Sequence, residues 1–180
     1  MSHKPEGESS RITHTTLAVV FQVRDAALHV LLWERGREPD RGAWALPGGT
    51  LAPDETLEQS VHRQLEVKVD VREVAHLEQL ATWGDPGRVP GVREIATAYL
   101  GLVRLGLDPE IPEDTAWHPV DRLPHTAFDH GAIVIAGRNR LRGKLSYSNT
   151  GFALAPESFT LAELRDIYTA ALGHDVSATN

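Results

Sequence analysis

The sequence predicts an α+β fold, in which a mixed β-sheet with a helix packed on it is followed by a smaller helical unit. Paired runs of β-branched and apolar residues indicate strands, and one segment between them switches to the period of a helix. The connections between strands are too short for repeated βαβ units. We therefore expect a mixed sheet rather than a doubly wound one.

The first 105 residues supply the predicted strands. Residues 15–23 and 28–33 are apolar runs joined by four residues, so we expect a hairpin of two buried strands. A loop rich in Gly, Pro and charge then leads to a short strand that begins at Trp44 and ends in a glycine turn. Two further strands are expected within residues 71–83 and 92–105, joined by a Gly- and Pro-rich loop.

One helix is predicted inside this sheet region. Residues 54–68 place Leu57, Val61 and Leu65 on one helical face, with Asp54 as the expected N-cap. This helix follows directly after the glycine turn, so the two features are expected to lie together.

The character of the chain changes near residue 127, and two further helices are predicted after it. Residues 127–141 are expected to be helical, as are residues 159–172, where Ser158 or Thr160 begins the helix and Gly173 ends it. With a polar tail at residues 1–11, the chain divides into a domain at 12–126 and a unit at 127–180.

Composition narrows the function classes. The chain has 180 residues, no cysteine and a formal net charge of −7, which excludes disulfide scaffolds, thiolate zinc sites and cysteine nucleophiles. The acidic excess lies entirely in residues 1–127, because residues 128–180 hold five acids and five bases. No run approaches the roughly 20 apolar residues of a membrane helix, so we expect a cytoplasmic protein with no membrane partner.

The glycine turn, Gly48-Gly49, has two interpretations. A glycine pair before an amphipathic helix can cradle phosphate, because its N–H groups and the helix N-terminus favour anions. A tight turn with no ligand explains the same pair, and spacing alone leaves both open.

The wider segment resembles the Nudix box of the nucleoside-diphosphate-linked hydrolases. After Leu46-Pro47-Gly48-Gly49-Thr50, the matching positions of the box are Glu55, Arg63, Leu65 and Val71. Three positions depart from it, since the box has metal-binding glutamates where this chain has Gln64, Val67 and Lys68. At about 100° per residue these three share one helical face and Glu66 points away.

An ammonium group in that position repels hard cations, which need carboxylate oxygens. We therefore predict no metal site and no Mg²⁺-dependent pyrophosphatase activity. An active hydrolase of ADP-ribose or a related nucleoside diphosphate remains the alternative, with metal ligands drawn from Glu55, Glu58 or Glu94.

The sequence therefore predicts a pocket that binds a ligand without hydrolysing it. Guanidinium groups suit a diphosphate and Trp suits a base or ribose face. The residues predicted to line this pocket are Arg35, Arg37, Trp44, Gly48, Gly49, Arg63, Arg88 and His130.

Nearly the whole chain also resembles the NrtR family, the Nudix-related regulators of NAD biosynthesis. The residues that carry this likeness are Gly84-Asp85-Pro86-Gly87-Arg88, Ala127-Phe128-Asp129-His130, Arg140-Leu141-Arg142, Lys144-Leu145, Tyr147, and Phe159 to Tyr168. The resemblance implies a homodimeric repressor with a C-terminal winged helix-turn-helix, in which ADP-ribose binding to the first domain releases operator DNA.

The expected DNA contacts lie in the C-terminal unit. Phosphate contacts are assigned to the densest basic cluster, Arg138, Arg140, Arg142 and Lys144. Arg138 and Arg142 share a helical face that excludes Arg140, and a solvated helix end explains the cluster almost as well. The recognition helix is expected to begin at Ser177, Thr179 and Asn180, so the winged helix is predicted to be incomplete. A nucleotide-binding module with no DNA partner is the third hypothesis.

Overall fold

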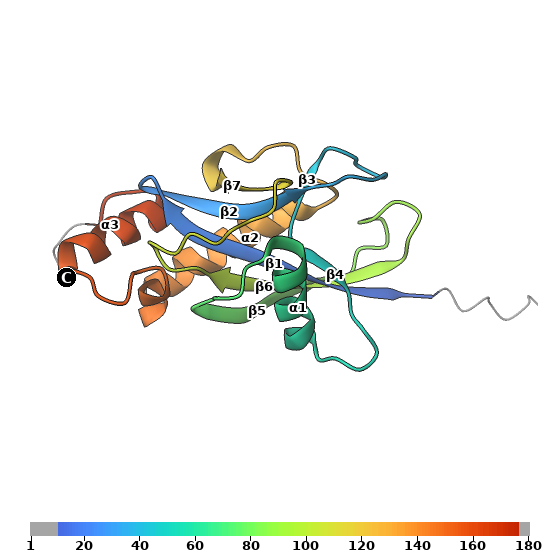
Figure 1. The fold of residues 1–180 in the computed structure, drawn as a ribbon, viewed down its shortest axis with the longest axis horizontal. Helices are drawn as coiled ribbons and strands as arrows, with labels where there is room; N and C mark the ends of the chain where they lie inside the picture. The colour runs from blue at the N-terminus through green and yellow to red at the C-terminus, as the bar shows by residue number, and fades with distance from the viewer. Residues whose placement is uncertain (1–10, 177–180) are drawn as a thin grey trace, which may run out of the picture.

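The computed structural model describes residues 11–176, and its core is one mixed β-sheet (Figure 1). Strands β1 (Thr13–Arg24) and β6 (Glu94–Leu102) pair in parallel at the centre, while β1 and β2 (Ala27–Glu34) form an antiparallel hairpin. The predicted mixed sheet and its opening hairpin are therefore confirmed. The strands are β1 (Thr13–Arg24), β2 (Ala27–Glu34), β3 (Trp44–Ala45), β4 (Gly48–Thr50), β5 (His76–Trp83), β6 (Glu94–Leu102) and β7 (Thr115–Pro119).

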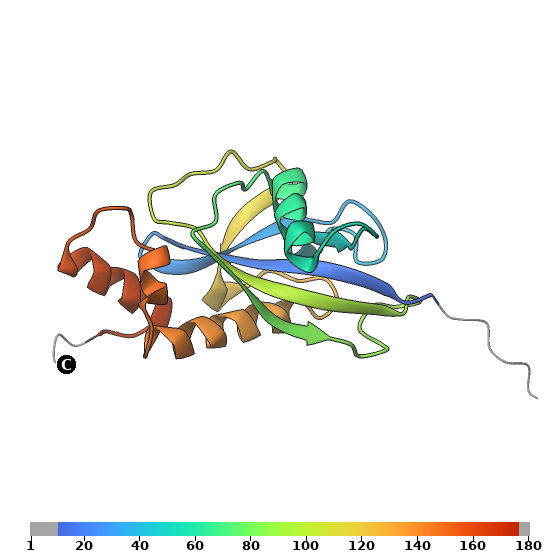
Figure 2. The same ribbon diagram turned by 90° about the horizontal axis from the view of Figure 1, so that it is seen from below.

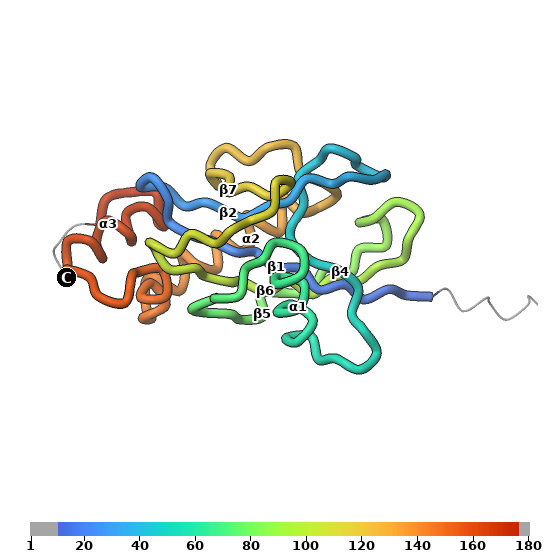
Figure 3. The backbone as a smooth tube through the Cα atoms, in the orientation of Figure 1, coloured from blue at the N-terminus to red at the C-terminus, as the bar shows by residue number. Residues whose placement is uncertain are grey.

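The sheet runs in the order β3-β2-β1-β6-β5, with β4 also paired to β1 and β7 paired to β2. Helix α1 (Leu57–Val69) and helix α2 (His130–Leu145) lie on opposite sides of it (Figure 2). Helix α3 (Leu161–Leu172) packs beyond the end of the sheet, next to the turn between β1 and β2 (Figure 3). Two short 3-10 helices, η1 (Val120–Arg122) and η2 (Asn149–Ala153), complete the elements of the described residues.

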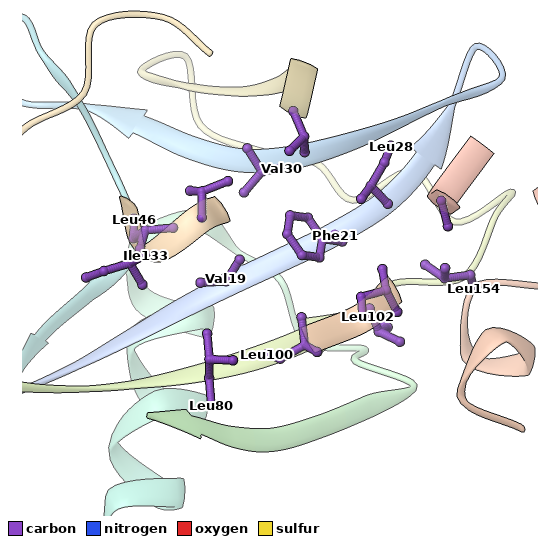
Figure 4. Packing of buried hydrophobic residues seen from close by; sticks show 14 of the residues in the cluster. Val19, Phe21, Leu28, Val30, Leu46, Leu80, Leu100, Leu102, Ile133 and Leu154 are labelled. Atoms are coloured by element: carbon purple, nitrogen blue, oxygen red, sulfur yellow. The ribbon is translucent and has the colours of Figure 1, made fainter. Parts of the chain in front are cut away.

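Along the central strands, apolar side chains point alternately to the two faces of the sheet, and both faces are packed. In β1, Val19 and Phe21 point to the α2 side, whereas Ala18 and Val20 point to the α1 side. Figure 4 shows the α2-side cluster, in which Ile133 of α2 lies among strand residues. Because both faces are covered, β1 is a near-continuous apolar run, as a buried central strand requires.

The C-terminal helices share this core with the sheet. Ile133 and Leu141 of α2 and Ile167 of α3 belong to the same buried cluster as Val19 and Phe21. Residues 127–176 are thus packed onto the sheet, and the predicted boundary at residue 126 falls between elements that share one core.

Helix caps follow the sequence in α3 and differ from the prediction in α1. Thr160 and Glu163 form a capping box and Gly173 ends α3 with φ 75°, as predicted. In α1 the predicted N-cap Asp54 is wrong: Thr56 caps the helix and exchanges hydrogen bonds with Gln59. The Thr56 hydroxyl accepts from the Gln59 N–H and the Gln59 side-chain oxygen accepts from the Thr56 N–H, so the pair satisfies two orphan N–H groups and favours this later start.

Two other boundaries shift. The strand expected from residue 71 begins at His76, and the helix expected from residue 127 begins at His130, after Phe128 takes a φ of 51°. Strand β7, which the sequence did not suggest, pairs with β2. Within residues 11–176, no helix is long and apolar enough to cross a bilayer. The predicted tail at 1–11 falls almost wholly outside this described part.

Candidate ligand-binding site

A cavity of about 360 Å³ opens beside β4 and the second half of α1. It brings together six of the eight residues that the sequence predicted for a ligand pocket, namely Arg35, Arg37, Gly48, Gly49, Arg63 and His130. Trp33, Gln64, Lys68, Glu94 and Phe128 also line it. Two larger cavities, of about 450 and 560 Å³, lie at α3 and at the loop around Arg104, and their described linings include no Trp, Tyr or Phe side chain.

The glycine turn is needed for packing. A Cβ atom on Gly48 would lie 2.3 Å from the Thr16 carbonyl oxygen, and one on Gly49 would lie 2.5 Å from the Gln64 amide. Helix α1 turns its second half, from Arg63 to Lys68, towards the cavity. The helix N-terminus carries its own capping box, and its first turn does not line the cavity, so of the two parts of the predicted phosphate cradle only the glycine turn lies there.

Arg63 is fixed by a carboxylate. It donates to Glu55 through Nε, at 2.8 Å, and through Nη2, and it also reaches the Thr50 carbonyl at 3.3 Å. The Arg63 hydrogen bonds, with a further one from the Ala52 amide, lower the pKa of Glu55 to about 2. Glu55 is therefore committed to Arg63, and the charge of Arg63 is already compensated.

The departures from the Nudix box lie where the helical arithmetic predicted. Gln64, Val67 and Lys68 all line the cavity, while Glu66 lies outside it and pairs with Arg72. With its amide oriented to satisfy both groups, Gln64 donates to the Gly48 carbonyl and accepts from Arg63 Nη1. Lys68 places its ammonium 5.1 Å from the centre of the Trp33 ring.

Arg88 takes a different place from the one predicted. Its side chain is 1% exposed and pairs with Glu94 and with Asp129, to which it donates at 2.8 and 3.0 Å. It lies behind the cavity, where it links the loop before β6 to the start of α2. A buried guanidinium that two carboxylates hold supports the fold instead of facing a ligand.

His130 faces the cavity as a neutral side chain. It is buried, and its Nδ1 accepts a hydrogen bond from the Leu46 amide at 3.0 Å. Burial is the main cause that lowers the pKa of His130 to about 4, and the nearby Arg88 lowers it further. At neutral pH the ring therefore adds a hydrogen-bonding edge to the site and no charge.

The aromatic side chain at the site is not the predicted one. Trp44 packs edge-on against His118, with ring centres 4.2 Å apart, and is absent from the cavity lining. Trp33 lines the cavity, and its Nε1 donates to the Leu46 carbonyl. Phe128 is also there, with the Arg35 guanidinium 4.7 Å from its ring centre. The sequence analysis missed Trp33, and its place near the end of β2, two residues before Arg35, is the signal that could have indicated it.

The basic cluster of α2 is divided between two sides of the helix, as its periodicity predicted. Arg138 and Arg142 line the cavity at α3, whereas Arg140 donates to the Leu80 carbonyl and Lys144 pairs with Glu78 of β5. Arg142 also reaches the Ala171 carbonyl at 3.5 Å. These contacts fasten α2 to its neighbours. The other predicted DNA contacts, Ser177, Thr179 and Asn180, lie outside the described residues.

Residues 13–136 match the NUDIX domain family. The chain is 32% identical to the ADPR responsive transcriptional repressor NtrR of Acinetobacter baylyi over 87% of its own length, and it spans 65% of the length of that relative. It is 30% identical to the ADP-ribose pyrophosphatase of Methanocaldococcus jannaschii, over 58% of this chain and 63% of that protein.

Two solved structures of Shewanella oneidensis NrtR resemble the fold. The one complexed with a 27mer DNA has a TM-score of 0.79 and 32% identity, over 91% of this chain and 78% of that chain. The one of its NUDIX domain complexed with ADP ribose has a TM-score of 0.64 and 32% identity, over 77% of this chain and 94% of that chain.

Proposed function

Because this chain belongs to the NUDIX family and is a relative of the NrtR regulators, we propose that it represses transcription of NAD biosynthesis genes and releases DNA when ADP-ribose binds. It acts as a homodimer on operator DNA in the bacterial cytoplasm. The fold and the site support this function over the alternatives, as follows.

The observation that carries the proposal is the charge of the 360 Å³ cavity. Arg35, Arg37 and Lys68 line it, and within residues 11–176 none of the three forms an ion pair with a carboxylate. A pocket with three uncompensated cations and an indole attracts an anion with an aromatic or sugar part. ADP-ribose, with a diphosphate between two riboses, has that chemistry.

We assign ligand contacts to the cavity-lining residues alone. Of the residues predicted from sequence these are Arg35, Arg37, Gly48, Gly49, Arg63 and His130, to which Trp33 and Lys68 are added. Trp44 and Arg88 act through packing and through the buried ion pairs.

Helix α2 is the physical connection from ligand to DNA. Its first residue, His130, lines the ligand cavity, and Arg142 in its last turn lies against α3. We propose that α3 is the first helix of the winged helix-turn-helix, with the unit beginning at residue 127. A ligand that displaces His130 or Phe128 shifts α2 as a rod, because a helix of this length is stiff and is packed along the sheet.

Titration of the complete protein on a labelled promoter fragment, with and without ADP-ribose, tests the function. We expect ADP-ribose to lower DNA affinity by about 5- to 150-fold, the usual range for coupled sites. Equal DNA affinity at saturating ADP-ribose would contradict the effector role. No binding to any promoter of an NAD biosynthesis gene would leave the third hypothesis, a nucleotide-binding module.

The alternative, a hydrolase, is favoured by the likeness to an ADP-ribose pyrophosphatase. We propose instead that the domain is catalytically inactive. Glu55 and Glu94 are held by Arg63 and Arg88, and within residues 11–176 no three His, Asp or Glu side chains gather as a metal site. Release of AMP from ADP-ribose with Mg²⁺ or Mn²⁺, abolished by Glu55→Gln, would overturn this proposal.

A further inference from the structure

The donor set at the cavity does not fit a divalent metal. The three positions where the resemblance implies metal-binding carboxylates offer an amide, an apolar group and a cation, from Gln64, Val67 and Lys68. The Gln64 amide is itself engaged by Gly48 and Arg63. Hard cations such as Mg²⁺ need several oxygen ligands with negative charge, and this side of the cavity supplies none.

The two carboxylates that remain near the cavity already form ion pairs with arginines. Glu94 lines it, but pairs with the buried Arg88, and Glu55 is bound twice by Arg63. Releasing either acid to a metal would leave an arginine without its partner. The charge left over in the cavity is therefore cationic, and it is carried by Arg35, Arg37 and Lys68.

Of these three cations, Lys68 is the one that stands where the resemblance implies a metal-binding carboxylate. It projects from the last turn of α1, and its ammonium lies 5.1 Å from the centre of the Trp33 ring. That ring is itself held by the hydrogen bond from Nε1 to the Leu46 carbonyl at 3.1 Å. An aromatic face stabilises an ammonium without neutralising it, so Lys68 stays available to an anion in the cavity.

We propose that this pocket binds the diphosphate of its ligand without a divalent metal, and that the Lys68 ammonium, held over Trp33, supplies the positive charge. The proposal rests on the proposed function, because it names how the same site takes ADP-ribose. It assigns Lys68 as a residue that determines both ligand affinity and metal independence.

Calorimetric titration with ADP-ribose tests the metal independence. The wild-type protein is titrated once in EDTA and once in millimolar Mg²⁺. We expect dissociation constants that agree within about twofold, because within residues 11–176 no three His, Asp or Glu side chains gather to hold a metal between protein and diphosphate.

Three variants test the role of Lys68. Lys68→Met removes the charge and keeps the length of the side chain, and it should weaken ADP-ribose binding in EDTA by about tenfold, as expected for one charge-assisted contact. Lys68→Glu should weaken it further in EDTA and make it stronger in Mg²⁺ than in EDTA. Arg72→Met is the matched control, since Arg72 is an exposed cation next to α1 that lies outside the cavity.

Adenosine provides a second control, because it lacks the diphosphate. Its affinity should be the same for the wild type and for Lys68→Met. If Lys68→Met weakened adenosine and ADP-ribose equally, the residue would act through the shape of the site, and the proposal would be wrong.

The outcomes separate this proposal from the function on which it rests. Wild-type binding of ADP-ribose only in Mg²⁺, or unchanged affinity in Lys68→Met, would overturn the proposal and leave the effector intact. A folded protein that binds no ADP-ribose in either buffer would instead overturn the proposed function.

Discussion

The last turns of α1 and α2 each carry a lysine next to the sheet, and the two lysines differ in their partners. Lys144 of α2 forms an ion pair with Glu78 of β5. Lys68 of α1 lies over Trp33 beside the ligand cavity and, within the described part of the chain, pairs with no carboxylate.

This difference shows which basic residues are free to bind a ligand. A cation that is paired inside the fold contributes to stability, and its field is largely cancelled at the surface. A cation without a carboxylate partner contributes little to stability and attracts anions. We therefore expect changes at paired cations to alter folding free energy, and changes at unpaired ones to alter ligand affinity.

Arg88 gives the largest expected effect among the paired cations. Arg88→Met leaves Asp129 and Glu94 without their buried partner and should lower the free energy of unfolding by about 3 kcal/mol. Urea denaturation measures this loss. Arg93→Met is the control, because Arg93 is in the same loop with an exposed hydrogen bond to the Gly84 carbonyl, and its loss should stay near 0.5 kcal/mol. Equal losses in both variants would contradict a special role for the ion pairs of Arg88.

His130 extends the comparison to a side chain that stays uncharged. Its pKa is lowered from 6.5 to about 4, first by burial. Its stabilising contribution is therefore complete above pH 6.5 and is lost as the pH falls towards 4, because the unfolded chain binds the proton first. Between pH 7 and pH 5 the free energy of unfolding should fall by about 2 kcal/mol from this group.

His130→Asn tests that origin, since its amide oxygen can accept from the Leu46 amide and does not titrate. Urea denaturation at pH 7 and pH 5 should show a smaller pH dependence in this variant than in the wild type. His62→Asn, on the exposed face of α1, should keep the wild-type dependence. The same pH dependence in all three proteins would assign the effect to other groups.

Arg35 represents the unpaired cations of the cavity. Arg35→Met should weaken ADP-ribose binding by about tenfold, because it removes a guanidinium from the predicted diphosphate site. The free energy of unfolding should change by less than about 1 kcal/mol, since the contact with Phe128 is a cation–π interaction near the surface. Calorimetry and urea denaturation measure the two quantities. Arg41→Met, in the same loop and outside the cavity, should change neither, and a loss of affinity there would point to a general charge effect.

The sequence predicted the parts of this molecule that depend on local pattern. The hairpin of β1 and β2, the capping box of Thr160 and Glu163, and the shared face of Gln64, Val67 and Lys68 follow from short-range periodicity and capping. Glu66 was expected to point away from that face, and it does. Such features are fixed within one or two turns of the chain.

Features that depend on contacts distant in sequence were not predictable in the same way. Arg88 is separated by 41 residues from Asp129, and Lys144 by 66 residues from Glu78, so no local pattern shows that either one is paired. Trp33 and Trp44 lie on neighbouring strands, but Trp33 pairs with Ala45 and Trp44 with Glu34, so the two indoles point to opposite faces of the sheet and Trp44 does not reach the cavity. The predicted ligand contacts that do not line the cavity, Arg88 and Trp44, are those whose side chains contact residues distant in the sequence.

Lys144→Met and Lys68→Met provide the most direct test of the comparison, with the smallest expected changes in stability. Lys144→Met should lower the free energy of unfolding by about 1 kcal/mol, because it removes a partly exposed ion pair that fastens α2 to β5. Its ADP-ribose affinity should stay within about twofold of the wild type, since α2 meets the cavity at its other end. Lys68→Met should show the opposite pattern, with weaker binding and nearly unchanged stability. Urea denaturation and calorimetry on the two variants measure both quantities. If Lys144→Met lost as much ADP-ribose affinity as Lys68→Met, the net charge of the protein, and not the pairing of each lysine, would determine ligand affinity.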